Sequence, residues 1–254
     1  MTINFDLTTL FSGSVSPVLF LDFDGTVSKI DVIDAILEEF ADPSWLEIEQ
    51  EWIDGRIGSR ECLRRQFELV RVTPLELDVF LAGFDLDEGT LSLLDLCRKI
   101  AIPVHIASDG FTYYIDRMLR KAINDPAAIA NVGVWANELI PTGKDRWRTN
   151  FPHLPNVCGD GCATCKPAVM KMNNRTGAPT VFIGDGLSDR FAAKSADVVF
   201  AKEKLVDFCG KNDILYHHYD NLQQISDSLR SAYESVTSHE SDGLGFLEPS
   251  LVQV

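Results

Sequence analysis

Two aspartates, Asp22 and Asp24, stand two positions apart in the motif DFDGT. The motif ends a short apolar run, so both carboxylates leave the run at the same point and can face one pocket. One carboxylate can attack phosphorus to form an aspartyl-phosphate, and the other can protonate the leaving oxygen and later activate water. Taken alone, the motif is also compatible with a solvated acidic turn.

Two further aspartates, together with the first pair, could form a metal-binding site. Two like charges as close as those of Asp22 and Asp24 need a cation between them, and Mg²⁺ prefers carboxylate and water oxygens. Asp185, in GDGLSD, follows another apolar run and is the natural additional ligand. Asp189 lies four residues further on, where it would join or orient the metal shell. These carboxylates predict magnesium as the cofactor.

A phosphoryl group also needs donors and positive charge around its oxygens. Ser108 follows an apolar run and precedes Asp109 and Gly110; a hydroxyl and backbone N–H groups at a glycine turn entering a helix form an anion site. Lys166 begins a short helical pattern and can neutralise phosphate and attacking carboxylate together. In isolation the serine is more typical of a helix cap, and the lysine of an exposed surface position.

The elements that must position these residues alternate between strands and helices. Continuous apolar runs predict buried parallel strands at 18–23, 102–107 and 180–183. Each is followed by a polar, glycine-containing turn, and helical patterns follow at 113–122 and 187–195. We therefore predict an α/β fold, a Rossmann-like doubly wound parallel sheet whose ligands gather beyond the strand C-termini.

The region between the first two strands has a different pattern. Apolar residues fall at helical spacing in four successive segments, and Thr73, Pro74 and Glu76 form a helix-start signature. We predict a helical-bundle cap at 29–97 inserted into a core of 1–28 plus 98–235. A mobile cap over an active site is the functional interpretation, and an ordinary helical subdomain is the alternative. Residues 236–254 lose periodicity and are predicted to form a flexible tail.

Composition narrows the class of partner. The net charge of −15 disfavours nucleic acid and anionic membranes, and no stretch approaches the roughly 20 apolar residues of a membrane span. The chain shows no secretory signal, and its six cysteines do not suggest a disulfide framework. We expect a cytoplasmic protein acting on a small molecule; the oligomeric state is not indicated.

The order of these motifs resembles that of haloacid dehalogenase phosphatases: DFDGT, a serine after an apolar strand, a lysine, then GDGLSD, over residues 18–200. The resemblance implies Asp22 as nucleophile and Asp24 as acid/base. Magnesium would be bound by the Asp22 and Asp185 carboxylates and the Asp24 backbone carbonyl. Phosphate would be held by Lys166 and Ser108, with Thr26, Asp109 and Gly110 in the phosphate-binding turns.

Two subgroups of that superfamily compete for the substrate. In the phosphoserine phosphatase pattern a Glu and a cap Arg bind the amino acid, and Asp31 and Arg64 occupy similar positions here. The alternative is that Asp31 caps a helix and Arg64 lies on a solvated helix face. The loop PHLPNVCGDGCATCK and the motif SDGFTYYI are similar to the methionine-salvage subgroup, which dephosphorylates 2-hydroxy-3-keto-5-methylthiopentenyl-1-phosphate. Phosphoethanolamine/phosphocholine phosphatases have a related loop. We favour the methionine-salvage subgroup.

The cysteine-bearing loop permits several chemistries. Cys158, Cys162 and Cys165, with His153 as a fourth ligand, would bind a structural zinc that fixes the lysine. The C-x3-C-x2-C spacing is not a standard zinc motif, so reduced thiols or a reversible disulfide are the alternatives.

Other activities of the same scaffold fit less well. Dehalogenases do not need the metal ligands Asp24 and Asp185, and carbon–phosphorus hydrolysis usually uses a cap lysine that 30–98 lacks. A phosphomutase keeps the same nucleophile and remains open. A non-catalytic phosphate-binding protein is the interpretation from a different class.

Overall fold

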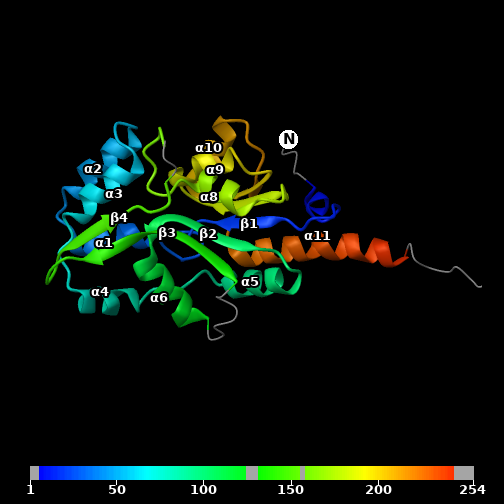
Figure 1. Cartoon of the computed structure of the whole chain (residues 1–254), viewed down its shortest axis with the longest axis horizontal. Helices are drawn as coiled ribbons and strands as arrows, with labels where there is room; N and C mark the ends of the chain where they lie inside the picture. Colours follow the sequence, from blue (N-terminus) through cyan, green and yellow to red (C-terminus); the bar gives the residue numbers. More distant parts are fainter. Residues whose placement is uncertain (1–5, 124–130, 155–157, 243–254) are drawn as a thin grey trace, which may run out of the picture.

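The computed structural model describes residues 6–123, 131–154 and 158–242. In this part of the chain, a seven-stranded sheet has the order β4-β3-β2-β1-β5-β6-β7 (Figure 1). Every pairing is parallel except that of β3 with β4. The strands are β1 (Val18–Leu21), β2 (Val104–Phe111), β3 (Val132–Pro141), β4 (Trp147–Asn150), β5 (Thr180–Gly184), β6 (Val198–Ala201) and β7 (His217–His218).

The strand order reverses at β1, because β2 and β3 lie on one side of it and β5, β6 and β7 on the other. All four residues of β1 are buried, as an all-apolar strand between two helical layers should be. A crevice outside the strand C-termini at such a switch point is where doubly wound folds bind ligands. The predicted fold class is confirmed.

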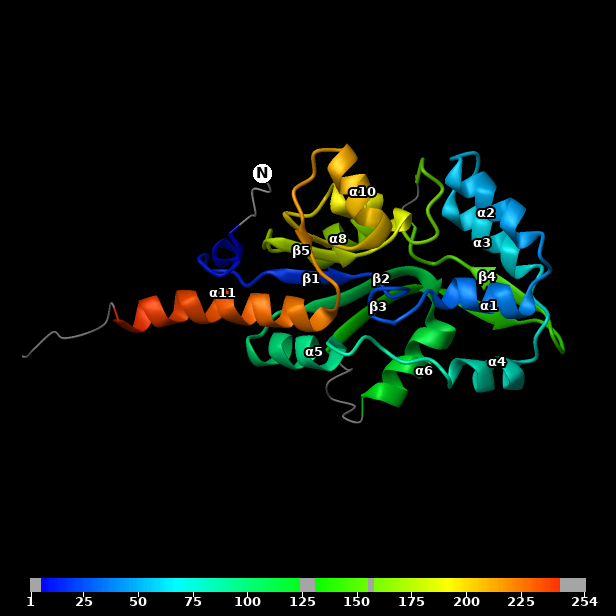
Figure 2. The ribbon, with the colours of Figure 1, turned by 180° about the vertical axis from the view of Figure 1, so that it is seen from behind.

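Helices cover both faces of the sheet (Figures 1 and 2). One face carries α5 (Thr90–Lys99), α6 (Thr112–Ala122) and α11 (Leu222–Asp242). The other carries α8 (Lys166–Asn173), η2 (Leu187–Asp189), α9 (Arg190–Ala193) and α10 (Glu203–Lys211), while the short η1 (Leu7–Leu10) contacts α11. Among the described residues, no helix combines the length and hydropathy that crossing a bilayer requires.

Two details differ from the sequence prediction. The expected turn at SDGF is a continuation of β2, which runs through Ser108 to Phe111 with an irregular register against β3. The α11 helix continues to Asp242, so 236–242 of the expected tail are helical, and 243–254 lie outside the described residues.

The helical insertion forms one end of the molecule (Figure 1). Its helices are α1 (Val32–Phe40), α2 (Trp45–Ile53), α3 (Ser59–Phe67) and α4 (Pro74–Leu81). The capping box of Thr73 and Glu76 starts α4 as predicted. The chain enters and leaves this region through adjacent segments, because Ser28 and Leu86 pair as an antiparallel bridge.

The predicted cap limit at residue 97 falls inside α5, which packs against α11 beneath the sheet. The Ser92 hydroxyl lies 3.2 Å from that of Ser226. We therefore propose that the cap consists of α1–α4 and ends at the bridge formed by Ser28 and Leu86, with α5 belonging to the core.

Candidate active site

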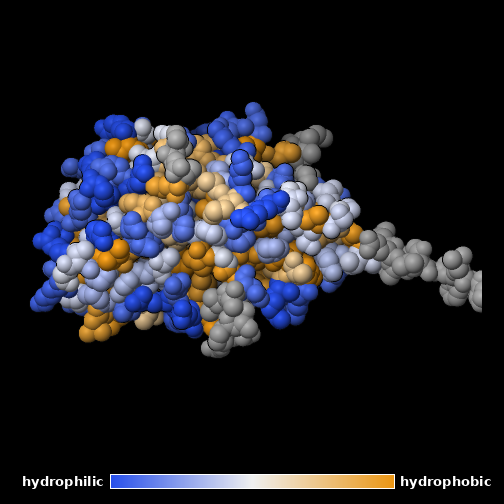
Figure 3. Space-filling view, in the orientation of Figure 1, coloured by the Kyte–Doolittle hydropathy of each residue, from blue (hydrophilic) through white to orange (hydrophobic). Residues whose placement is uncertain are grey.

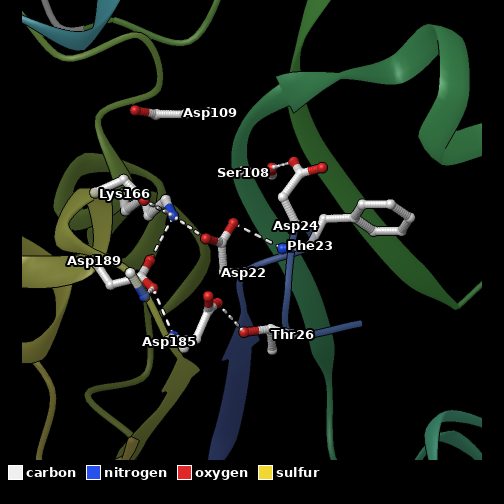
Figure 4. Close-up of polar contacts among 12 residues, drawn as sticks. Asp22, Phe23, Asp24, Thr26, Ser108, Asp109, Lys166, Asp185 and Asp189 are labelled. Atoms are coloured by element: carbon white, nitrogen blue, oxygen red, sulfur yellow. Dashed lines mark hydrogen bonds and ion pairs between the residues drawn. The ribbon is translucent and has the colours of Figure 1, made fainter. Parts of the chain in front are cut away.

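The first two aspartates leave the C-terminal end of β1 and are both nearly buried, with 5% of Asp22 and 8% of Asp24 exposed. Figure 4 shows the two side chains pointing in different directions: Asp22 toward Lys166, Asp24 toward Ser108. The turn requires Gly25, whose φ is +71° and where a Cβ would lie 2.5 Å from a carboxylate oxygen of Asp185. The DFDGT turn thus packs against the Asp185 carboxylate, which follows the end of β5.

Lys166 stands at the first position of α8, and only 1% of its side chain is exposed. Its ammonium lies 2.9 Å from an oxygen of Asp22 and 2.5 Å from one of Asp189. A buried lysine between two carboxylates is not the exposed surface residue of the alternative interpretation. It contacts the predicted nucleophile directly.

Asp189 is completely buried and orients its neighbours. One of its oxygens accepts hydrogen bonds from the backbone N–H groups of Asp185 and Gly186, at 3.0 and 3.1 Å, while the other binds Lys166. Both of its oxygens therefore already have donors, which favours an orienting role over direct metal ligation.

Thr26 was predicted to bind phosphate, but the structure places it elsewhere. Its side chain is fully buried, and its hydroxyl donates to Asp185 at 2.6 Å. It does not line the cavity described below. The physical reason is that Thr26 lies beneath Asp185, so it fixes the orientation of that carboxylate.

The carboxylates suit a hard divalent cation. One oxygen each of Asp22, Asp185 and Asp189 lies within 4.8 Å of the other two. Oxygen-only donors from two or three carboxylates with room for water match the preference of Mg²⁺. Asp22 and Asp185 would hold the ion, with Thr26 and Asp189 orienting the latter carboxylate.

Asp24 is held by three donors. The Tyr114 hydroxyl donates to it at 2.7 Å, the Val32 backbone N–H at 3.1 Å and the Ser108 hydroxyl at 3.3 Å. Tyr114 was missed by the sequence analysis. The signal was its fixed place in SDGFTYYI, which sets it on the first turn of α6, directly after the end of β2 that carries Ser108.

Ser108 and Gly110, which were predicted to bind phosphate, line the cavity, and the Ser108 hydroxyl also accepts from the Gly110 N–H at 2.9 Å. Asp109 lines it too, but its carboxylate accepts from the Thr164 N–H at 2.8 Å. Asp109 thus connects the β2 end to the segment that precedes Lys166.

Burial governs the electrostatics of the site. It raises the pKa of Asp22 well above the usual range, and the Asp189 charge adds to the effect, while Lys166 opposes it. Burial and Asp189 raise the pKa of Asp185 to about 7. Burial alone would lower the pKa of Lys166, yet Asp189 and Asp22 raise it, so the lysine stays charged. Burial raises the pKa of Asp24 to about 6, against the hydrogen bonds from Tyr114, Val32 and Ser108.

These residues open into a cavity of about 270 Å³ between core and cap. Asp22, Asp24, Ser108, Asp109, Gly110 and Asp185 line its core side. Its cap side combines apolar and acidic side chains: Ile33, Asp34, Glu49, Trp52, Ile53, Cys62, Leu63 and Gln66. The cap therefore forms the wall that a bound leaving group would contact.

A model of the haloacid dehalogenase-like hydrolase family matches residues 19–194, a range that contains Asp22, Lys166 and Asp189. The chain belongs to this family.

Relatives of similar length are phosphatases. A protein of Geobacillus thermodenitrificans is 29% identical over 216 residues, covering 84% of this chain and 95% of that protein. A protein of Bacillus pumilus is 26% identical over 233 residues, covering 89% of this chain and 98% of that protein. Both are named 2-hydroxy-3-keto-5-methylthiopentenyl-1-phosphate phosphatase.

Solved structures support the fold of this haloacid dehalogenase family member. A substrate-bound phosphoserine phosphatase matches with a TM-score of 0.58 at 20% identity, over 76% of this chain and 90% of the other. The phosphoserine phosphatase from T. onnurineus in complex with NDSB-201 matches with a TM-score of 0.62 at 13% identity, over 85% of this chain and 98% of the other. The prediction of a phosphatase of this superfamily is confirmed.

Of the two residues predicted to recognise an amino acid, one lines the cavity and the other does not. Asp31 lines the cavity and also caps α1, accepting from the Asp34 N–H at 3.0 Å. Arg64 does not line the cavity. It pairs with Glu61 and Glu68 at 2.7 and 2.6 Å, and all three side chains are exposed. Figure 3 shows a mainly hydrophilic surface over the end of the molecule that holds α2 and α3. The helical phase of α3 turns Cys62, Leu63 and Gln66 inward and Arg64 outward.

The zinc hypothesis gains no support from the described residues. Cys158, Cys162, Cys165 and His153 do not converge as a group with metal-ligand spacing. The His153 ring instead contacts that of Trp135, with centroids 5.3 Å apart.

Proposed function

We propose that this family member is a magnesium-dependent phosphomonoesterase that acts on a small soluble phosphate ester through an aspartyl-phosphate at Asp22. The observation that carries the proposal is the 2.9 Å contact between the Lys166 ammonium and the Asp22 carboxylate, at the floor of a cavity that Asp185 also lines. The lysine keeps the nucleophile close to a positive charge, and that charge also attracts the phosphate.

In the first half-reaction an Asp22 oxygen attacks phosphorus, and the bond from phosphorus to the ester oxygen breaks. The carboxyl group of Asp24 delivers its proton to the leaving oxygen, a role favoured by a pKa of about 6. Ser108 and Gly110 lie at the cavity wall. The Ser108 hydroxyl, which donates to Asp24 at 3.3 Å in the free chain, can donate to a phosphoryl oxygen instead.

In the second half-reaction the Asp24 carboxylate accepts a proton from water, whose oxygen attacks the aspartyl-phosphate. The bond from phosphorus to Asp22 breaks, which releases phosphate and restores the carboxylate. When bound, Mg²⁺ would supply positive charge to the phosphoryl oxygens and reduce the repulsion between carboxylates.

For the substrate, we propose a phosphorylated metabolite with a neutral, partly apolar leaving group, such as the methionine-salvage enol-phosphate. The apolar residues Trp52, Ile53 and Leu63 on the cap wall support this choice, and so do the names of the relatives. Phosphoserine is disfavoured because Arg64, the predicted partner of its carboxylate, is paired outside the cavity.

A phosphorylated amino alcohol, such as phosphoethanolamine or phosphocholine, is the second candidate. Asp34 and Glu49 place carboxylates on the same cap wall as Trp52. A carboxylate and an aromatic face are the groups that bind an ammonium.

The test is phosphate release from purified protein with the enol-phosphate, phosphoethanolamine, phosphocholine, phosphoserine and sugar phosphates. We expect a preference for the enol-phosphate, loss of activity in EDTA and in Asp22→Asn, and recovery with Mg²⁺. A preference for an amino alcohol ester would support the second candidate. Metal-independent release would contradict the site. Release from none of the esters would contradict the hydrolase proposal and favour a mutase or a binding protein.

A further inference from the structure

Two glutamates of α2 have opposite environments, although both contact α3, which packs beside α2 in the cap (Figures 1 and 2). Glu51 does not line the cavity, and both of its carboxylate oxygens accept from the Arg65 guanidinium, at 2.6 and 3.1 Å. Glu49 lines the cavity, and its partners on α3 are the uncharged side chains of Gln66 and Cys62. The charge of Glu51 is therefore balanced by its partner, whereas the charge of Glu49 is not.

Gln66 fixes the orientation of the Glu49 carboxylate. Only 1% of Gln66 is exposed, and its side-chain amide donates to Oε2 of Glu49 at 2.9 Å. The Cys62 thiol donates to the same oxygen at 3.6 Å. Within the described part of the chain, no hydrogen bond or ion pair reaches the other oxygen, Oε1. An acceptor with a fixed orientation is thus left for a bound molecule in the cavity that Glu49 lines.

Glu49 lies where it would contact the alcohol part of a phosphate ester. Asp22 and Ser108 are on the core side of the cavity, whereas Glu49 is on the cap side. Two lysines, Lys29 and Lys204, also line the cavity, but both are exposed, and among the described residues neither pairs with Glu49. At an effective dielectric constant of about 20, two like charges about 6 Å apart repel enough to weaken binding about a hundredfold. A carboxylate near Glu49 would therefore be rejected, and a hydrogen-bond donor would be accepted.

We propose that Glu49, positioned by Gln66, selects the leaving group of the substrate. Its Oε1 accepts a hydrogen bond from a hydroxyl or an ammonium group on the alcohol part of the ester, and its charge excludes a carboxylate at that place. The selection rests on the proposed function, because it concerns the substrate of the same site. An enol hydroxyl and an amino alcohol both supply the donor that Glu49 requires.

The experiment uses four phosphate esters that differ only in the group at the end of a two-carbon chain: 2-aminoethyl, 2-hydroxyethyl, n-propyl and 2-carboxyethyl phosphate. We measure kcat/KM for each ester at saturating Mg²⁺. The wild-type chain should use the amino and hydroxyl esters best, n-propyl phosphate less well and the carboxyl ester least.

Glu49→Gln removes the charge and keeps the shape of the side chain. It should lower kcat/KM for the aminoethyl ester about tenfold, raise it for the carboxyethyl ester about tenfold or more, and leave n-propyl phosphate nearly unchanged. The matched control is Glu51→Gln on the same helix, which should change none of the four values appreciably. Gln66→Met, which removes the amide donor at similar volume, should reduce the preference for the aminoethyl over the carboxyethyl ester without altering the use of n-propyl phosphate.

Contrary results are distinct for each part of the proposal. Equal effects of Glu49→Gln on all four esters, or the same effects in Glu51→Gln, would overturn the selection by Glu49. An unchanged preference in Gln66→Met would overturn the positioning role of Gln66.

Calorimetric binding of the four esters to the Asp22→Asn chain separates the selection from turnover. We expect the aminoethyl ester to bind more tightly than the carboxyethyl ester, and the additional change Glu49→Gln to remove most of that difference. If this holds while the wild-type chain releases phosphate from none of the esters, the proposed function fails and the selection stands. Equal binding of all four esters, or binding of none, would overturn the selection even in an active phosphatase.

Discussion

Tyr114→Phe tests whether Tyr114 positions Asp24 for proton transfer. The substitution removes one hydroxyl, whose oxygen lies 2.7 Å from the Asp24 carboxylate. A hydrogen bond to a charged group contributes about 1.5 to 3 kcal/mol. Because the Val32 N–H and Ser108 still bind Asp24, we expect the lower value, which corresponds to about a tenfold loss of rate.

The assay compares leaving groups. An alkyl phosphate needs its leaving oxygen protonated, whereas an aryl phosphate with an acidic phenol needs little help. We expect kcat/KM, which reports the first half-reaction, to fall about tenfold in Tyr114→Phe with the alkyl ester and less than about twofold with the aryl ester. The matched control is Tyr113→Phe, since the Tyr113 hydroxyl binds Asp78 of α4 at 2.8 Å, away from the site. Equal losses with both esters, or equal effects of the two tyrosine variants, would refute the positioning role.

Three further predictions follow from the buried charges. Lys166→Met should lower kcat/KM by about a hundredfold or more and reduce the free energy of unfolding by about 3–5 kcal/mol, because it leaves buried carboxylates unpaired. Lys171→Met, at an exposed position of the same helix, should change neither kcat/KM nor the free energy of unfolding. If the activity assay and calorimetry gave similar losses for both variants, the assigned role of Lys166 would be contradicted. Thr26→Val should raise the Mg²⁺ concentration needed for half-maximal activity, because Asp185 loses a 2.6 Å donor, and an unchanged magnesium titration would show that the contact does not matter. The stabilisation by Mg²⁺ should increase with pH. The pKa of Asp185 is about 7 in the metal-free folded chain and 3.8 ordinarily, so between those values the folded state holds a proton that the unfolded state has lost. The metal-free chain therefore loses stability as the pH rises from about 4 to 7, while Mg²⁺ binds the ionised carboxylate. The increase in Tm on adding Mg²⁺ should be larger at about pH 8 than at about pH 5.5, and a constant increase would contradict this.

The strands and their acidic ends were predictable because buried parallel strands have continuous apolar runs. The run before Asp22 and the run before Asp185 are β1 and β5, which are adjacent in the sheet. That adjacency brings their carboxylates together, as the shared C-terminal edge of parallel strands requires. Lys166 could be placed only through the order of the motifs, because α8 has no local signal that distinguishes a buried lysine from an exposed one.

The residues that prediction missed depend on side-chain direction. Arg64 was predicted by analogy to contact substrate, with a solvated helix face as the alternative; Glu61 and Glu68, at the i−3 and i+4 positions, pair with it on an exposed face. Thr26 belongs to a motif that was predicted to bind phosphate, and its hydroxyl donates to Asp185. Tyr114 and Asp24 are 90 positions apart in sequence. The place of Tyr114 in SDGFTYYI indicates that it lies near the site, but it does not identify Asp24 as its partner.

The most direct test of the central claim is to identify the residue that carries the phosphoryl group. The protein is mixed with Mg²⁺ and a good substrate, stopped by rapid acidification, and treated with borohydride, which reduces an acyl phosphate of aspartate to homoserine. Peptide mass spectrometry should find homoserine at position 22, and none in a sample without Mg²⁺ or without substrate. Reduction at another aspartate, or phosphate release with no reducible acyl phosphate at Asp22, would contradict the account.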